Sequence, residues 1–459
     1  MDLATHVEER TPRGIAATVA RLVRSGDLRP GDRLPTVREV AAALAVSPAT
    51  VSGAYQALAT VGVVASRGRA GTFVLPPAAG WLPPRYRDLA GGAPATRWDL
   101  SLGTPDPELL PALGPSLARV AARSPAARTG TYVSDPLVPE LERLLRDTWP
   151  FAAARLTVVD GALDAMSRTL EQVAGFGDRV AVEDPGFPPL LDLLDHLGLE
   201  RVPVPVDRHG MVPVALDAAL ATGADVVMLQ PRAHNPTGAS LTATRARDLA
   251  AVVRRHSTPL ADGSGARVRP ARRIVVVEDD HSGEIASTRD VSLGTWLPDA
   301  VVHVRSYSKS HGPDLRIAAV GGPAVVLDAL VARRMLGPGW TSRLLQHTLV
   351  DLLTDGEATA TVAHARRVYF ARRRALVGAL AEHGVVMEPG DGINLWLPVH
   401  DERTALVRLE AAGIRVAPGG PFLAAPAPAG APDHVRVTVG VLGDDVDGVA
   451  RALAVAAAP

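Results

Sequence analysis

Apolar residues in the first 75 positions recur at the spacing of short helices. A first run ends at Gly26 and consists of Ile15, Val19, Leu22 and Val23. Thr36 and Glu39 stand three residues apart, as in a capping box, where a Thr hydroxyl accepts from a helix amide and a Glu reaches back. This pattern predicts a second short helix, which extends to Leu44.

A third helix is predicted to begin at Ser47, because Pro48 suits the first helical position, and to end at Leu58. Two short helices separated by a tight turn have the geometry of a helix-turn-helix. Two β-prone runs then flank a basic segment at residues 67–71, which indicates a hairpin. The order of these elements predicts a winged helix-turn-helix over residues 1–75.

The pattern changes beyond residue 98, where short β-prone runs alternate with amphipathic helical stretches. The candidates for buried strands are Arg155–Val159, Arg179–Val182, Val226–Leu229, Ile274–Val277 and Val301–Val304. Such alternation predicts a layered α/β domain with a largely parallel sheet. Residues 76–97, between the two regions, are rich in Pro and Gly and have no helical or strand periodicity. They are predicted to form a semi-stiff tether.

Composition adds limits to this picture. The 459 residues suggest about three domains at roughly 150 residues each. The chain has no Cys, which excludes disulfides, thiolate metal sites and a cysteine nucleophile, and no metal site is predicted. No uncharged apolar run reaches the ~18 residues of a membrane span, and the polar N-terminus is unlike a signal peptide. We therefore expect a cytoplasmic protein.

The first 75 residues resemble the DNA-binding domain of the GntR family. The matching segments are residues 31–39, 46–51, 54–55, 58 and 68–74. The resemblance implies that the helix from Ser47 enters the major groove, with bases or backbone met by Ser47, Ala49 and Thr50. It implies phosphate contacts for Arg38, Tyr55, Arg67 and Arg69. The net charge of +3 in this region, nine Arg against six acidic residues, agrees with DNA binding. A small helical protein-interaction module is the alternative.

Lys309 is the only lysine, since the other 47 of the 48 Lys and Arg residues are Arg. A lysine amine can lose its proton and attack a carbonyl to form a Schiff base, whereas Arg stays protonated. The alternative is a codon accident on a surface loop. Polar clusters follow all five predicted strands, at residues 160–162, 183–185, 230–238, 278–281 and 306–309. Ligands of open α/β sheets bind at the carboxyl ends of strands, so these clusters predict one site.

Pyridoxal 5′-phosphate (PLP) would give such a lysine its aldehyde partner. The cofactor requires a phosphate cradle, a carboxylate for its pyridine nitrogen and a stacking ring. Free amides at the start of the helix after Gly161 could bind the phosphate. The other candidates are Ser308 and Arg316 for the phosphate, Asp279 for the pyridinium, Phe187 for stacking and Asn235 for the ring hydroxyl oxygen.

Residues 98–459 resemble the fold-type I aminotransferases, an α/β PLP-dependent transferase fold with a large and a small part. The matching motifs lie at residues 131–136, 183–187, 234–238, 278–280, 306–309, 315–316 and 435–437, in the family's order. The resemblance implies that Lys309 carries the internal aldimine. It implies phosphate contacts from Ala162, Leu163, Ser306, Ser308 and Arg316, with Tyr132 added from a neighbouring subunit.

The same resemblance implies that Asp279 pairs with the pyridine nitrogen, that Phe187 stacks, and that Asn235 and His281 flank the ring oxygen. Arg436 would clamp an effector or substrate carboxylate, a bidentate task that suits guanidinium. The family usually has Tyr near the position of His281, and imidazole differs from a phenol in reach and in pKa. This departure favours a regulator over a transaminase.

A GntR-type winged helix joined to an aminotransferase-like domain is the architecture of the MocR/GabR-type regulators. The resemblance implies a PLP-dependent regulator that binds operator DNA as a head-to-tail homodimer. The expected divisions are residues 1–75, 76–97 and 98–459, with a large part at about 126–329 and a small part at about 98–125 plus 330–459. The expected signal is an amine or amino acid that exchanges with Lys309. The alternatives are a working aminotransferase with a DNA-binding domain and a sensor of PLP itself.

Overall fold

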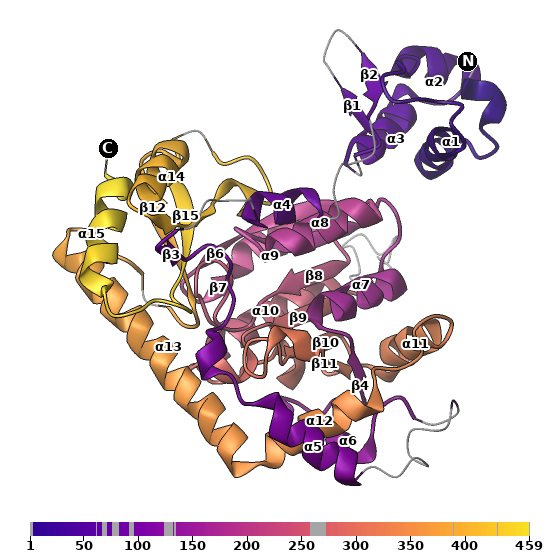
Figure 1. Cartoon of the computed structure of the whole chain (residues 1–459). Helices are drawn as coiled ribbons and strands as arrows, with labels where there is room; N and C mark the ends of the chain where they lie inside the picture. The colour runs from indigo at the N-terminus through magenta and orange to yellow at the C-terminus, as the bar shows by residue number, and fades with distance from the viewer. Residues whose placement is uncertain are drawn as a thin grey trace.

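The computed structural model describes most of the chain, namely residues 3–60, 62–66, 71–75, 82–90, 96–123, 132, 135–257, 272–388, 390–428 and 430–458. Figure 1 shows a small N-terminal unit of helices with a hairpin and a larger body built around a sheet. In the part of the chain so described, no helix has the length and apolar character needed to cross a membrane.

The N-terminal unit has the predicted winged helix-turn-helix order. Its elements are α1 (Pro12–Ser25), α2 (Val37–Leu44), α3 (Pro48–Thr60), β1 (Val64–Ser66) and β2 (Thr72–Val74). The capping box is present, because the Glu39 N–H donates to the Thr36 hydroxyl and the Thr36 N–H donates to the Glu39 carboxylate at 2.7 Å. The apolar faces of the three helices form one buried core, which includes Ile15, Val19, Leu22, Val40, Leu44, Val51 and Leu58.

The prediction that residues 76–97 lack secondary structure is wrong for residues 84–90, which form helix α4 (Pro84–Ala90). The side chain of Asp192, on helix α8 (Pro188–Leu197) of the body, caps the start of α4. Its Oδ2 accepts the N–H groups of Arg85 at 3.0 Å and Tyr86 at 3.3 Å. Because this cap comes from a residue more than 100 positions away, the sequence of residues 84–90 carries little sign of it.

The body contains an eight-stranded sheet within the described residues, in the order β4-β11-β10-β9-β8-β5-β6-β7. Its strands are β4 (Arg155–Val159), β5 (Arg179–Asp184), β6 (Glu200–Asp207), β7 (Gly210–Met211), β8 (Val226–Leu229), β9 (Val275–Asp280), β10 (Val301–Ser306) and β11 (Ala318–Gly322). All five predicted strands are present. The strands from β10 to β6 pair in parallel, and β11 runs antiparallel between β10 and β4.

Helices cover both faces of this sheet (Figure 1). One face packs against α7 (Ala162–Val173), α8 and α11 (Ala324–Met335). The opposite face packs against α9 (Pro213–Ala221) and α10 (Ala243–Ser257). Beyond β4, a further cluster holds α6 (Pro139–Thr148) and α12 (Arg343–Thr354), and α5 (Leu113–Arg123) packs on α12. The central strands β5, β8, β9 and β10 are buried on both faces, so they appear in the sequence as continuous apolar runs.

A smaller sheet, β12-β15-β14, forms the centre of the C-terminal part. Its strands are β12 (Asn394–Val399), β14 (Ala417–Pro418) and β15 (Asp433–Thr438), and its helices are α13 (Gly356–Glu382), α14 (Glu402–Ala411) and α15 (Val446–Ala457). Strand β3 (Trp98–Asp99) pairs in parallel with β13 (Ile414–Arg415). The chain therefore enters the body through its small part, crosses to the large sheet and returns.

Asp391 joins the two parts of the body. Its buried carboxylate accepts the N–H groups of Ser287 at 2.8 Å and Thr288 at 2.7 Å, and its own N–H donates to the Gly238 carbonyl at 2.8 Å. The segment that contains Asn235 thereby has a fixed position relative to the small sheet.

Replacing Asp391 with Ala should destabilise the protein, because several donors lose their acceptor at a buried site. A loss of roughly 2 kcal/mol is expected, which lowers the midpoint of thermal unfolding by about 3 °C in a body of this size. Circular dichroism on heating measures the shift. Asp299→Ala, at an exposed surface position, is the control and should leave the midpoint unchanged.

Candidate cofactor site and DNA-binding surface

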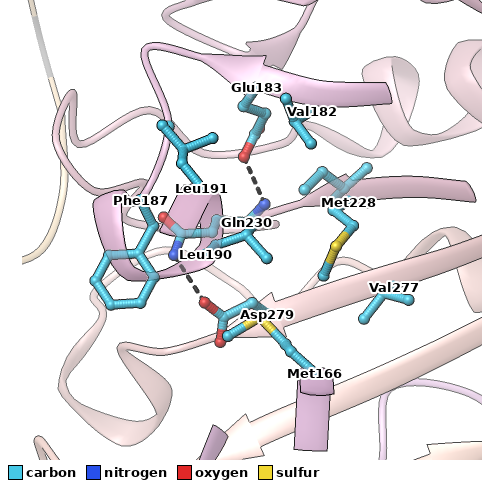
Figure 2. Close-up of a pocket in the computed structure, with 12 residues that line it drawn as sticks. Met166, Val182, Glu183, Phe187, Leu190, Leu191, Met228, Gln230, Val277 and Asp279 are labelled. Atoms are coloured by element: carbon cyan, nitrogen blue, oxygen red, sulfur yellow. Dashed lines mark hydrogen bonds between the residues drawn. The ribbon is translucent and has the colours of Figure 1, made fainter. Parts of the chain in front are cut away.

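The predicted site residues of the body gather at one edge of the large sheet. Strands β4, β5, β8, β9 and β10 run in the same direction, so their carboxyl ends meet there. Asp279 lies near the end of β9, Lys309 follows β10, and Phe187 precedes α8 after β5. Phe187 and Asp279 line one pocket together with Gln230 and Glu183 (Figure 2).

The Lys309 amine lies in surroundings that favour its neutral form. Burial lowers the pKa of Lys309 to about 8, the Arg436 charge adds to this effect, and the Asp279 carboxylate opposes it. A lysine with an ordinary pKa near 10.4 is almost fully protonated at neutral pH. A far larger share of Lys309 is a free amine, which is the form that attacks a carbonyl.

Asp279 is a buried carboxylate with one oxygen unused. Its Oδ2 accepts a hydrogen bond of 2.8 Å from the Gln230 side chain (Figure 2), and its Oδ1 has no partner among the described residues. Burial raises the pKa of Asp279 to about 6, while Gln230 and Lys309 act to lower it. An unpartnered buried oxygen is an acceptor that a bound ligand can satisfy. A protonated pyridine nitrogen is a donor that fits Oδ1.

The start of α7, where we expect the cofactor phosphate, has free backbone donors. Gly161 precedes the helix with φ 108°, and no side chain caps the free N–H groups that follow, those of Ala162 and Leu163. The Arg316 guanidinium donates to the Asp160 carbonyl at 2.7 Å and crosses over Gly161, where a Cβ would stand 2.6 Å from it. Only glycine fits between the guanidinium and the helix start. At the end of β10, the Ser308 N–H donates to the Ser306 hydroxyl at 3.3 Å.

Arg436 is a buried cation without an acidic partner among the described residues. It donates to the Ser101 carbonyl and, at 3.3 Å, to the Asn235 side-chain oxygen, and its Nε has no partner. Its guanidinium lies 5.2 Å from the centre of the Phe422 ring. Burial lowers the pKa of Arg436 to about 10. An uncompensated buried charge is costly, so the arrangement favours an anionic ligand.

His281 is close to Lys309, but one of its two ring nitrogens already has a hydrogen-bond partner. Its Nε2 lies 2.9 Å from the Ala233 carbonyl oxygen. Burial, followed by the Lys309 charge, lowers the pKa of His281 well below its usual range, so the ring is neutral. A neutral imidazole that donates to the Ala233 carbonyl has only an acceptor left at Nδ1. It therefore has no second donor for a ring oxygen.

Tyr132 stands apart from the other site residues within its own chain. Its side chain is 83% exposed, and the ring contact that the structure gives it is an edge contact with Trp340 at 6.2 Å. This placement leaves Tyr132 open to a neighbouring subunit.

Gln230, Ser101 and Phe422 also contact residues of the site. The sequence placed Gln230 in a polar cluster of the site but gave none of the three an individual role. Gln230 follows β8 directly, and a polar residue at that position was a usable signal. Ser101 and Phe422 lie in segments of the sequence that carry no motif. Only the tertiary structure shows that they are close to the site.

The predicted DNA contacts of the N-terminal unit fall into two groups. Ser47, Ala49 and Thr50 lie at the start of α3, where Ser47 caps the helix by accepting the Thr50 N–H at 3.1 Å, and Arg38 is exposed on α2. Tyr55 is 6% exposed and donates to the Pro35 carbonyl at 2.8 Å, so its hydroxyl has a partner within the fold. Arg67 and Arg69 lie outside the described residues.

Comparison with known families identifies both domains. Residues 98–453 match the family "Aminotransferase class I and II", and residues 11–74 match "Bacterial regulatory proteins, gntR family". Among solved structures, the chain is similar to LysN, an α-aminoadipate aminotransferase from Thermus thermophilus. The TM-score is 0.67 with 22% identity, over 81% of this chain and 94% of that one. This similarity shows the fold.

Similar proteins also share the two-domain order. The chain is 37% identical to the vitamin B6 salvage pathway transcriptional repressor PtsJ of Salmonella typhimurium, over 95% of this chain and 96% of that protein. It is 29% identical to the transcriptional regulator TauR of Rhodobacter capsulatus, over 87% of each. The chain therefore belongs to the MocR/GabR-type transcriptional regulators, in which a gntR-family DNA-binding domain is joined to an aminotransferase class I and II domain.

Proposed function

We propose that this regulator binds PLP at Lys309 and that its affinity for operator DNA depends on which ligand occupies that site. The observation that carries the proposal is a buried lysine, whose pKa burial lowers to about 8, beside a buried carboxylate whose Oδ1 is unused. PLP brings an aldehyde for the amine and a pyridinium that draws electrons from the bound group. As a DNA-binding protein, the chain is expected to work in the cytoplasm.

The chain's own residues meet each end of such a cofactor. Asp279 would hold the pyridine nitrogen, and Phe187, at the rim of the same pocket, would stack on the ring. The free N–H groups at the start of α7 and the Arg316 guanidinium would hold the phosphate, with Ser306 and Ser308 beside them. Asn235 would face the ring oxygen, and Tyr132 of the second subunit would complete the cradle in a head-to-tail homodimer.

Arg436 supports an amino acid or another carboxylate-bearing amine as the signal. Its charge is buried beside Asn235 without an acidic partner among the described residues, so a carboxylate at this position would relieve the cost of burial. The amine end of the same molecule would then reach Lys309. The neutral state of His281 and its bond to Ala233 support a sensor rather than a transaminase, because the ring oxygen has no donor from that side chain.

A second candidate is that PLP itself is the signal. Two relatives support it by name, the vitamin B6 salvage pathway repressor already described and the pyridoxine biosynthesis regulator PdxR of Corynebacterium glutamicum, which is 26% identical over 83% of this chain. In that case Arg436 would still need an anion, and occupancy of the PLP site alone would change DNA binding.

Helix α4 supplies a route from the site to the DNA-binding domain. Its Arg85 donates to Asp192 at 2.9 Å and to Asp195 at 2.7 Å, both on α8, whose first residue follows Phe187. Helix α4 also contacts the short helix η8 (Gly420–Phe422). The Phe422 ring of η8 lies beside the Arg436 guanidinium, and the Phe422 carbonyl accepts the Gly186 N–H at 2.8 Å. Figure 1 shows α4 lying along α8.

This docking shortens the effective linker. Only residues 76–81 lie between the last described residue of the DNA-binding domain and the segment that carries α4. Six residues can span at most ~22 Å. A movement of the small part relative to α8 would therefore be transmitted through α4 to the DNA-binding domain. A ligand can drive this movement only if it binds the two conformations with different affinities.

Loading with PLP should depend on the neutral form of Lys309. The rate should be low well below pH 8, because the amine is protonated there, and should rise with pH to a plateau with a midpoint of about 8. Stopped-flow absorbance of the bound cofactor gives the profile. Lys309→Ala should abolish the absorbance change that accompanies formation of the Schiff base. A midpoint near 10 would show that the lysine is not in the environment described.

Arg436→Gln should remove the preference for a carboxylate. In the wild type, an effector amino acid should perturb the cofactor's absorbance at a concentration about 10 to 100 times lower than the corresponding amine without its carboxylate, because a charge-assisted pair is lost in the latter. In the variant the two ligands should titrate alike. Gel shifts on the chain's own upstream DNA are run in parallel.

Three results would change the interpretation of that experiment. A wild type without preference, whose DNA binding responds to PLP alone, favours the second candidate. Repeated turnover of an amino donor with a keto-acid acceptor would favour a working aminotransferase. DNA binding that ignores PLP and amines would contradict both sensor proposals.

Arg85→Ala should uncouple the two domains. The variant loses the side-chain bonds to Asp192 and Asp195, so α4 is held to α8 only by its backbone cap, whereas the residues of the cofactor site stay in place. The ratio of DNA affinities with and without ligand should fall toward 1, while the absorbance of bound PLP stays that of the wild type. Arg87→Ala on the same helix is the control, since the Arg87 side chain donates only to the Leu82 carbonyl among the bonds described. An unchanged ratio in Arg85→Ala would exclude this route.

A further inference from the structure

The side chain of Gln230 connects the residue expected at the pyridine nitrogen of the cofactor with the residue expected at its ring hydroxyl oxygen. Its Nε2 donates to Asp279 Oδ2 at 2.8 Å (Figure 2), and its Oε1 accepts the backbone N–H of Asn235 at 2.7 Å. Gln230 is 5% exposed, so water does not compete for these bonds. One amide therefore contacts both the pyridine side and the oxygen side of the site.

The orientation of this amide is fixed by its partners. The Asn235 N–H can only donate, so it requires the oxygen of the Gln230 amide. The amide nitrogen must then face Asp279, because the reverse orientation would place two donors together at Asn235 and two acceptors together at Asp279. The backbone N–H of Gln230 donates to Glu183 Oε2 at 2.8 Å, which holds the residue from behind.

This donor matters because the surroundings of Asp279 oppose its charge. Burial is the largest influence on its pKa, and the carboxylates of Asp280 and Glu183 act in the same direction. The Lys309 amine acts in the opposite direction, but it loses its positive charge as it becomes a nucleophile. A neutral amide is a donor whose effect on the carboxylate does not depend on the protonation of Lys309.

We propose that Gln230 is a positioning residue that keeps Asp279 ionised, directs its Oδ1 toward the pyridine nitrogen and holds Asn235 at the ring hydroxyl oxygen. The inference rests on the proposed PLP site and adds a residue to it. A purely structural Gln230 would affect stability without changing the protonation of the bound cofactor. The spectrum of bound PLP against pH separates these roles.

The test compares full-length wild type with Gln230→Met and Gln230→Glu. Met has a similar length but no donor, and Glu places an acceptor against Asp279. PLP is titrated at several pH values, and its visible absorbance and dissociation constant are recorded. In the wild type, affinity should fall as the pH drops through about 6, because a protonated Asp279 cannot pair with a pyridinium.

In Gln230→Met the midpoint of this fall should move up by about one pH unit. PLP should then bind about twofold more weakly at pH 7, and the loss should approach about tenfold below pH 6, the equivalent of one pKa unit. Gln230→Glu should show a larger upward shift, because a like charge is added. Both variants should bring a change in the absorbance band of bound PLP.

Gln346→Met is the matched control. Gln346 is equally buried and makes bonds of the same kind, from the Val138 N–H at 2.9 Å and to the Pro136 and Thr341 carbonyls at 2.8 Å, away from the residues of the pocket. It should lower the unfolding midpoint to a similar extent and leave the pH midpoint of PLP binding unchanged.

The possible outcomes separate the inference from the proposed function. If wild type gives no visible band with PLP, the proposed cofactor site itself is wrong. If wild type binds PLP and both Gln230 variants keep its pH midpoint and affinity, the role proposed for Gln230 is overturned. If Gln346→Met shifts the midpoint as much as Gln230→Met does, the effect is one of general stability and the proposal also fails.

Discussion

The burial of charge at the end of the large sheet is the constraint on which the rest of the structure depends. Asp279, Lys309 and Arg436 face a common region with two potential cations and one carboxylate, and burial shifts the pKa of each toward its neutral form. Such an arrangement is unfavourable unless ligands complete it. A pyridinium for Asp279, an aldehyde for Lys309 and a carboxylate for Arg436 would each remove part of the cost. Burial makes these charges costly, and because it lowers the pKa of Lys309 it also makes the lysine more reactive.

The scaffold holds this site by using both faces of strand β9. Side chains alternate along a strand, so Asp279 faces the cofactor side while Glu278 and Asp280 face the other. On that other side, Glu278 pairs with His303 at 2.8 Å and Asp280 binds Arg232 through two hydrogen bonds. Their charges are satisfied, in contrast to that of Asp279. The strand is thus fixed by complete pairs on one face, which leaves the incomplete group on the other face free to bind.

The coupling to DNA that we propose depends on a segment whose composition gives little sign of its structure. Pro and Gly on either side of α4 suggest a tether, yet Asp192 and Asp195 anchor its Arg85 to the helix that begins beside Phe187. The contact with η8 brings the same helix to the small part of the body. A regulator requires that the occupied and empty states differ at a distance from the site. A docked helix that contacts both the large and the small part of the body would transmit this difference more directly than a free chain of about twenty residues.

Local sequence was sufficient wherever one segment carries its own signal. The capping box at Thr36, the buried strands, and the polar residues that follow each strand were all predictable, because caps and continuous apolar runs depend on neighbouring residues. The single lysine predicted Schiff-base chemistry, and the polar clusters predicted a role for Asn235. The family resemblance added roles for Arg436 and Tyr132. All of these roles remain predictions.

Tertiary structure decided the features that depend on residues far apart in the chain. A carboxylate on α8 caps helix α4, and the Ala233 carbonyl takes the one N–H that His281 keeps when burial makes its ring neutral. The free oxygen of Asp279 is visible only once Gln230 is seen to occupy the other. Sequence determines which chemical groups the chain possesses, but whether a buried group is satisfied or left open depends on which partners the fold brings within hydrogen-bond distance.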